Sequence, residues 1–138
     1  MSGTRNIVAD ASFVVELLLP DHGFDRSRTP LVSDRTIVHV PHVCDAEVTS
    51  ALRSLYLSGF IELSVFKRSV VRYSRMSLRR HHAQRYLHRV HELIHNFSVY
   101  DCMYVLLARA LNLEFATTDH RLRRAMQAHA ADVSLLEW

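Results

Sequence analysis

Cysteine, glycine and proline are scarce in this chain: it has two, three and three of them among 138 residues. Two cysteines without a CxxC spacing cannot form a disulfide framework, so we expect Cys44 and Cys102 to be reduced, half-buried side chains. The low glycine and proline content excludes collagen-like and low-complexity chains. With 49% hydrophobic and 22% charged residues, the composition is that of an ordinary globular domain.

Long hydrophobic runs are absent as well. No apolar stretch reaches the roughly 20 residues that a membrane-spanning helix needs, and Glu16 interrupts the apolar run at residues 13–19. The first ten residues predict a strand rather than a signal peptide. At this length we expect a single domain over residues 1–138 with its own hydrophobic core. We expect the protein in the cytoplasm.

Lysine is almost missing: the chain has sixteen arginines and one lysine, and its formal net charge is +3. Residues 67–91 contain no Asp or Glu, although eight cations fall there: Lys67, Arg68, Arg72, Arg75, Arg79, Arg80, Arg85 and Arg89. Such a run suits a polyanionic ligand such as RNA. It is equally consistent with a solvated helical surface, so both interpretations stay open.

Apolar residues recur at strand-like and helix-like spacings in turn, which predicts an α/β fold. Strands are expected at residues 5–10, 37–40, 76–80, 113–118 and 133–136. Helices are expected at residues 12–19, 45–58, 63–73, 86–97, 98–111 and 121–130. Asp45 is the expected N-cap of the second helix, which Gly59 ends. Alternating strands and helices favour a mostly parallel sheet covered by helices on both faces.

Two carboxylates stand at the ends of short apolar runs. Asp10 follows residues 7–9, and Asp119 follows residues 115–118. Ligands of α/β folds bind at the carboxyl edge of parallel strands, so both acids are expected to face a binding site. Glu47 and Asp101 fall in the first turns of expected helices. Each acid also has a simpler possible role, because acids cap helix N-termini and complement the helix dipole.

Residues near these acids help to distinguish a role in the binding site from a role as a helix cap. Two residues apart in a helix, Asp45 and Glu47 point about 200° apart, so at most one of them reaches the site. Asp45 is the better cap and Glu47 the better ligand. Ser12 could cap the first helix in place of Asp10. Thr117 lies two residues before Asp119, on the same side of the strand.

Four acids gathered at one sheet edge would repel one another unless a divalent cation joined them. Like charges raise one another's pKa, and a bound dication reverses that effect. Oxygen-only ligands favour Mg²⁺ or Mn²⁺ over Zn²⁺. The sequence therefore predicts a metal-dependent phosphoryl-transfer site formed by these acids, with a hydroxyl that could hold a metal-bound water: Asp10, Glu47, Asp101, Asp119 and Thr117.

Four segments of the chain match the motifs of a known protein family, in the same order and at the same spacing. They are Val8-Ala9-Asp10-Ala11-Ser12, Pro41 through Glu47-Val48 with Ala51-Leu52-Arg53, residues 99–108, and Thr117-Thr118-Asp119-His120-Arg121-Leu122. Together they resemble the PIN-domain ribonucleases, specifically the VapC-type toxins of bacterial toxin–antitoxin systems, over nearly the full chain. Cys102 stands where this family usually has alanine, and residues 21–35 match no family pattern.

The resemblance implies a three-layer α/β/α PIN-like fold and a homodimer. It implies an endoribonuclease that uses Mg²⁺ or Mn²⁺, inhibits translation and is itself inhibited by a VapB-type antitoxin. Asp10, Glu47, Asp101 and Asp119 carry over as catalytic and metal-binding residues, with Ser12 and Thr117 in support. Under this hypothesis, an ion held mainly by Asp10 and Asp101 lowers the pKa of a water that attacks the phosphorus in line. The other two acids would orient waters or hold a second ion.

Other functions compete with this one. A receiver-like Mg²⁺-binding module needs a late lysine near the site, but Lys67 lies between the motifs. An aspartyl phosphatase needs a second acid where Ser12 stands. An inactive nucleic-acid-binding module stays open. His88, His91 and His95 have a spacing that suits a transition metal on a helix, although an exposed surface stripe is the commoner outcome.

Overall fold

Helices and strands alternate along the chain, as the spacing of apolar residues predicts. The computed structural model describes residues 3–19 and 35–137, so most of the turn-rich stretch at residues 21–35 lies outside it. The elements are β1 (Arg5–Ala9), α1 (Ala11–Leu18), β2 (Thr36–Pro41), α2 (Val43–Leu57), α3 (Leu63–Arg75), β3 (Leu78–His81), the 3-10 helix η2 (Ala83–Glu92), α4 (Val99–Leu111), β4 (Glu114–Ala116) and α5 (His120–His129). None of the described helices is long and apolar enough to cross a bilayer.

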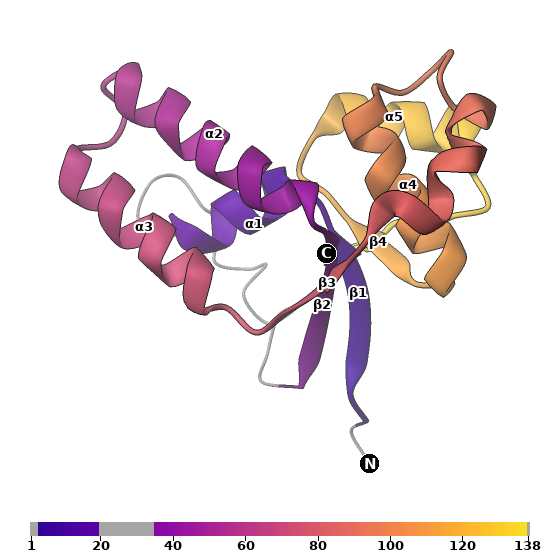
Figure 1. Ribbon diagram of the computed structural model, residues 1–138, viewed down its shortest axis with the longest axis horizontal. Helices are drawn as coiled ribbons and strands as arrows, with labels where there is room; N and C mark the ends of the chain where they lie inside the picture. Colours follow the sequence, from indigo (N-terminus) through magenta and orange to yellow (C-terminus); the bar gives the residue numbers. More distant parts are fainter. Residues whose placement is uncertain (1–2, 20–34, 138) are drawn as a thin grey trace.

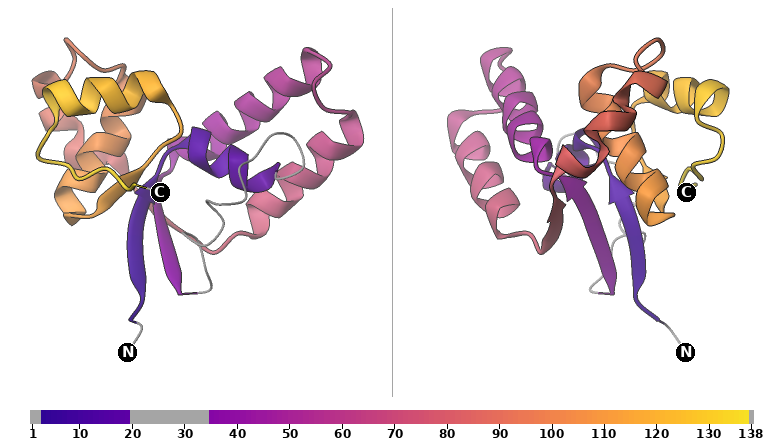
Figure 2. Two further views of the ribbon diagram at one scale, coloured as in Figure 1. Left: turned by 180° about the vertical axis from the view of Figure 1, so that it is seen from behind. Right: turned by 45° about the vertical axis from the view of Figure 1, so that its right-hand side comes forward.

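The strands form one sheet in the order β3-β2-β1-β4, and every pair is parallel. The chain steps outward from β1 to β2 and β3, then returns past β1 to form β4. Right-handed crossovers in these two directions place helices on opposite faces of the sheet. Accordingly, α1, α2 and α3 cover one face, while α4 and α5 cover the other (Figures 1 and 2). The predicted three-layer α/β/α fold with a parallel sheet is confirmed.

The direction of the crossovers reverses at β1, which lies between β2 and β4. In open α/β sheets, ligands bind outside the carboxyl ends of the strands at such a reversal. Asp10 directly follows β1, and Thr117 directly follows β4. Figure 1 shows these strand ends between the α1–α3 helices and the α4–α5 helices.

The central strand and α4 form the rigid part of the core. Ile7, Val8 and Ala9 are fully inaccessible to solvent, as expected for a strand covered on both faces. Helix α4 contacts β1, β2 and β4, and residues 102–108 are all buried, which explains why this helix is apolar on every side. Tyr104 packs edge-on against Phe115 with ring centroids 6.3 Å apart. This packing holds the second turn of α4 against β4.

Two segments do not form the type of secondary structure that the sequence predicts. Residues 133–136 form no full strand: one parallel bridge joins Leu135 to Phe115, with both hydrogen bonds at 2.8 Å. Strand β4 is only three residues long and offers little edge for pairing. Residues 86–97 form no α-helix, because the 3-10 helix η2 and turns occupy them. No residue of η2 is fully buried, so this segment lacks the packing that stabilises most α-helices.

The start of α2 also differs from prediction. His42, not Asp45, is the N-cap, and Asp45 lies inside the first turn. The Asp45 carboxylate instead accepts hydrogen bonds from the Tyr73 hydroxyl at 2.7 Å and the Arg80 Nε at 2.9 Å. Gly59 follows the helix as expected, at a φ of +82° that glycine adopts without strain. Both cysteines are free and buried, more deeply than expected.

Candidate active site

Asp10 lies at the junction of β1 and α1 with only 6% of its surface exposed. Its Oδ1 accepts hydrogen bonds from the Phe13 backbone N–H at 3.0 Å and the Ser12 hydroxyl at 2.7 Å. Its Oδ2 accepts one from the Thr117 hydroxyl at 2.6 Å. Asp10 is therefore the N-cap of α1, a role that the sequence left open between Asp10 and Ser12. Because a carboxylate has about four lone-pair positions, Oδ2 can still accept one more partner.

The ionised form of Asp10 is costly in this position. Burial raises the pKa of Asp10 to about 6; the hydrogen bonds from Thr117, Ser12 and Phe13 offset part of that rise, and the charge of Asp119 adds to it. A cation close to Oδ2 would stabilise the ionised carboxylate. A bound metal ion would therefore lower the free energy of the ionised Asp10 carboxylate.

Two hydroxyls tie the end of β1 to the end of β4. The fully buried Thr117 donates to Asp10 and accepts from the Asp119 backbone N–H at 3.1 Å. The Ser12 hydroxyl donates to Asp10 and accepts from the Thr118 backbone N–H at 3.1 Å. Since each hydroxyl has one proton and gives it to Asp10, the 3.2 Å approach between the two oxygens is a contact rather than a bond.

Replacing Thr117 with valine tests this link. The isosteric Thr117→Val change removes the shortest hydrogen bond to Asp10 and leaves the Asp119 N–H without its acceptor. We expect a loss of about 1–3 kcal/mol in unfolding free energy and a further rise in the pKa of Asp10. Urea denaturation and carbon-13 NMR titration of the carboxyl measure the two effects. Unchanged stability and an unchanged pKa would show that Thr117 does not hold Asp10.

Asp119 caps the last helix, as one of its two sequence interpretations proposed. Its Oδ1 accepts from the backbone N–H groups of Arg121 at 2.9 Å and Leu122 at 3.2 Å. Among the described residues, no hydrogen bond reaches Oδ2. Capping and ligand binding are therefore compatible, because they use different oxygens of the same carboxylate.

Asp101 comes from the first turn of α4, as expected. Glu47 lies in the second turn of α2 and not in its first, because this helix begins at Val43, before the expected N-cap Asp45. Ser98 is the N-cap of α4, and its hydroxyl accepts from the Asp101 N–H at 3.1 Å. Burial raises the pKa of Asp101, the Ser98 hydroxyl lowers it, and the charge of Asp119 raises it. Burial likewise raises the pKa of Glu47; the nearby Tyr104 hydroxyl lowers it, and the charge of Asp101 raises it.

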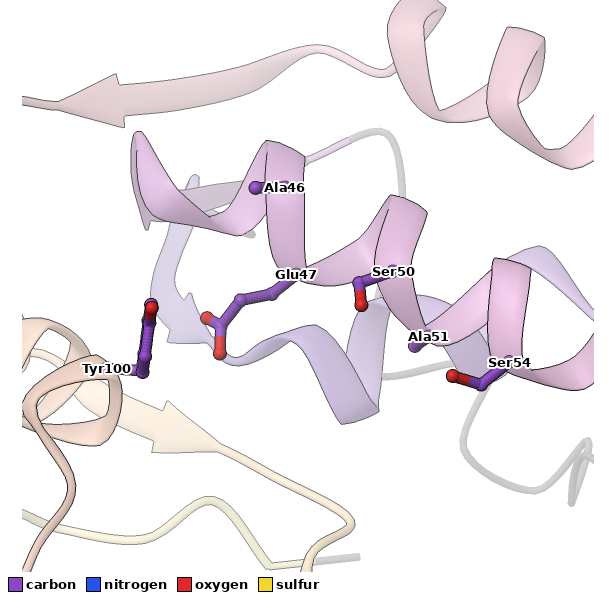
Figure 3. Close-up of a pocket in the computed structure, with 6 residues that line it drawn as sticks. All are labelled: Ala46, Glu47, Ser50, Ala51, Ser54 and Tyr100. Atoms are coloured by element: carbon purple, nitrogen blue, oxygen red, sulfur yellow. The ribbon is translucent and has the colours of Figure 1, made fainter.

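Glu47 points from α2 toward Tyr100 on α4, across a cavity of about 480 Å³ (Figure 3). The cavity is lined by Ala46, Glu47, Ser50, Ala51, Ser54 and Tyr100. The Glu47 Oε1 and the Tyr104 hydroxyl are both buried without a hydrogen-bond partner among the described residues. An unpaired buried acceptor costs about 1–3 kcal/mol, which a bound ion or water would remove. Asp45, two residues earlier, binds Tyr73 and Arg80 instead, as the divergence of about 200° predicts.

The four carboxylates influence one another in a chain. Asp119 raises the pKa of both Asp10 and Asp101, and Asp101 raises that of Glu47. Within residues 3–19 and 35–137, however, no three His, Cys, Asp or Glu side chains are grouped closely enough to hold an ion by themselves. Mg²⁺ usually keeps several waters and takes one or two protein carboxylates. The available oxygens of these acids therefore fit Mg²⁺ or Mn²⁺ with water as the remaining ligands.

The sequence did not identify Tyr104 as a neighbour of the site. Its ring packs against Phe115, and its hydroxyl lies near Glu47 and Cys44. Its spacing could have indicated this position, because a residue three positions after Asp101 lies on the same face of the helix. The exposed His88, His91 and His95 form no metal-binding group in the described part of the chain.

Comparisons with known proteins identify the family of this chain. The family model described as the PIN domain matches residues 7–127. Ribonuclease VapC9 of Mycobacterium tuberculosis is 34% identical over 122 residues, covering 88% of this chain and 92% of that protein. Ribonuclease VapC1 of the same organism is 33% identical over 119 residues, covering 86% of this chain and 89% of that protein.

Solved structures share the fold at lower identity. VapC20 of Mycobacterium tuberculosis, described as a toxin that cleaves the sarcin-ricin loop, superposes with a TM-score of 0.58 at 16% identity, over 86% of this chain and 94% of that chain. VapBC2 of Rickettsia felis, bound to a DNA fragment from its promoter, gives 0.63 at 12% identity, over 96% and 98%. This chain belongs to the PIN domain family and, within it, to the VapC ribonucleases.

Proposed function

We propose that this protein is an endoribonuclease toxin that hydrolyses RNA phosphodiester bonds with Mg²⁺ or Mn²⁺. The observation that carries the proposal is that Asp119 raises the pKa of Asp10 and Asp101, and Asp101 that of Glu47, with Asp10 at the end of β1, where the direction of the crossovers reverses. Asp10 and Asp101 would hold the ion, and Glu47 and Asp119 would orient waters or a second ion. These four residues are the proposed catalytic set.

Hydrogen bonds and burial within the protein orient the site carboxylates before RNA binds. Ser12 and Thr117 fix both oxygens of Asp10, so its remaining lone pair has a defined direction. The Glu47 Oε1 is desolvated and unpaired, which favours a cation or a water as its partner. When bound, the ion lowers the pKa of a water and offsets charge on the phosphate. The Thr117 and Ser12 hydroxyls and the Phe13 backbone N–H lower the pKa of Asp10 and so offset part of the rise that burial causes, which favours the ionised carboxylate.

We further propose a VapB-type antitoxin as the regulatory partner, a homodimer as the active assembly, the cytoplasm as its location and inhibition of translation as its effect. The fold match to a chain of the VapBC2 structure of Rickettsia felis supports an antitoxin. Exposed apolar side chains at the end of α2 and the start of α3 supply surface for protein contacts: Leu57, Phe60 and Leu63.

The metal requirement gives the direct test. We expect purified protein to cleave RNA with Mg²⁺ or Mn²⁺, and cleavage to fall to background with EDTA and to return when Mg²⁺ is restored. Gel analysis of end-labelled RNA measures cleavage, and tryptic digestion checks that EDTA leaves the fold intact. Cleavage that persists in EDTA would exclude the metal-dependent mechanism. RNA binding without cleavage under every metal condition would favour the inactive binding module.

A further inference from the structure

The basic run of the sequence splits into two groups in the structure. Helix α3, which packs on α1 and α2, carries Lys67, Arg68, Arg72 and Arg75. Strand β3 and η2 carry Arg79, Arg80, Arg85 and Arg89. Because β3 is parallel to β1 and two strands away from it, its carboxyl end lies about 10 Å along the sheet edge from the end of β1. The second group is therefore on the same edge as Asp10.

A cavity of about 180 Å³ opens at this end of β3. It is lined by Arg80, His81, His82, Arg85 and Tyr86. No carboxylate lines it, and no described residue forms an ion pair with Arg85. A concave site with two guanidinium groups, two imidazoles and no acid favours an anion.

Several of the lining side chains are held by residues outside the cavity. The Arg80 Nε donates to Asp45 at 2.9 Å, and its guanidinium lies over the Tyr73 ring at 5.6 Å. Tyr73 donates to the same Asp45 oxygen at 2.7 Å. The two Nη groups of Arg80 make no hydrogen bond within the described residues, so they remain free to bind a ligand. A guanidinium fixed in this way loses little entropy when it binds phosphate.

The imidazoles are held in the same manner. A ring nitrogen of His81 lies 2.9 Å from one of His39, whose other nitrogen lies 2.9 Å from the Asn6 Oδ1. His82 stacks on His42 with centroids 4.5 Å apart. Burial lowers the pKa of His81, and the charges of Arg85 and His42 lower it further, which agrees with a concentration of positive charge here.

We propose that the cavity formed by Arg80, His81, His82, Arg85 and Tyr86 binds a non-scissile phosphodiester group of the RNA backbone. This inference rests on the proposed function, because it assigns the cavity to the same substrate. Phosphate matches it in charge, and the parallel donors of a guanidinium match two phosphate oxygens. The site holds the strand in place, while the acids farther along the same sheet edge act on another phosphate of the same chain.

Binding without cleavage separates this inference from the nuclease assignment. The probe is a short, mixed-sequence, single-stranded 2′-O-methyl RNA carrying a fluorophore, in EDTA, with anisotropy as the readout. We expect Arg85→Ala to weaken binding about tenfold and to reduce the slope of log K against log[salt] by about 0.7. His82→Ala should weaken binding by a smaller factor. Both positions are exposed, and circular dichroism checks that the variants fold.

Arg68→Ala is the matched control, since it removes the same charge from an exposed position on α3. Equal effects of Arg68→Ala and Arg85→Ala would overturn the proposal and leave only a general charge effect. Inorganic phosphate is the second probe. Competition by phosphate that disappears in Arg85→Ala supports the site, whereas phosphate that binds there without being displaced by RNA makes free phosphate the ligand and overturns it. If RNA binds as expected but is never cleaved with Mg²⁺, the nuclease proposal fails and the binding site stands.

Discussion

The Asp101→Asn variant is expected to lose RNA cleavage by about 10²–10³-fold at saturating Mg²⁺. Removing one charged ligand forfeits several kcal/mol of ion and charge stabilisation, and each 1.36 kcal/mol corresponds to about a tenfold change in rate. The fold should survive, because Ser98 caps α4 through the backbone N–H of residue 101 and not through its side chain. Initial rates on a labelled RNA, with urea denaturation alongside, measure both quantities.

The matched control is Asp132→Asn, which also neutralises one aspartate. Asp132 forms a two-bond ion pair with Arg109 at 2.6 and 2.9 Å and is half exposed, so its loss should cost less than about 1 kcal/mol of stability and leave cleavage unchanged. If Asp101→Asn cleaves RNA at the rate of Asp132→Asn, Asp101 does not hold the ion.

The ends of β1 and β4 were predictable because an apolar run gives way there to polar residues. Apolar residues 7–9 lead into Asp10, and a buried run before a carboxylate indicates a strand that ends at a polar edge. Right-handed crossovers determine which face of the sheet each helix covers once the order of the strands is known, but that order comes from the structure and was not predicted. Local sequence could not separate the capping role of Asp10 from a ligand role. In the structure, Oδ1 serves the cap while Oδ2 keeps a free lone pair.

The contacts that sequence reasoning missed join residues far apart in the chain. Asp45 meets partners 28 and 35 positions later, so nothing near Asp45 in the sequence distinguishes this role from a helix cap. Residues 133 and 136 are both buried, as residues on the two faces of a covered strand would be, yet only one bridge forms there. Burial determines the apolar pattern, while strand pairing depends on the length of the neighbouring edge.

The Asp10→Asn variant is expected to be more stable than the wild type in EDTA at pH 7, by up to about 3 kcal/mol, although it should not cleave RNA. The pKa of Asp10 rises from 3.8 to about 6 in the folded protein. Between these pH values the folded state binds more protons than the unfolded state, so the unfolding free energy of the wild type falls as the pH rises from about 4 to about 6. The shift of about two units corresponds to about 3 kcal/mol.

The side-chain amide introduced by Asp10→Asn keeps the acceptor for Phe13 and Ser12 and carries no charge, so the variant lacks this pH-dependent loss. Its N–H groups replace the oxygen that accepts from Thr117, and the loss of that bond reduces the gain by an amount that does not change with pH. Urea denaturation at several pH values between about 4 and 7 should show the two proteins diverging as the pH rises. A difference that does not change with pH would show that Asp10 does not titrate in this range. Added Mg²⁺ should stabilise the wild type, by about 2.7 kcal/mol at about one hundred times its Kd, and not the variant. The destabilising charge at Asp10 is then the same charge that binds the ion.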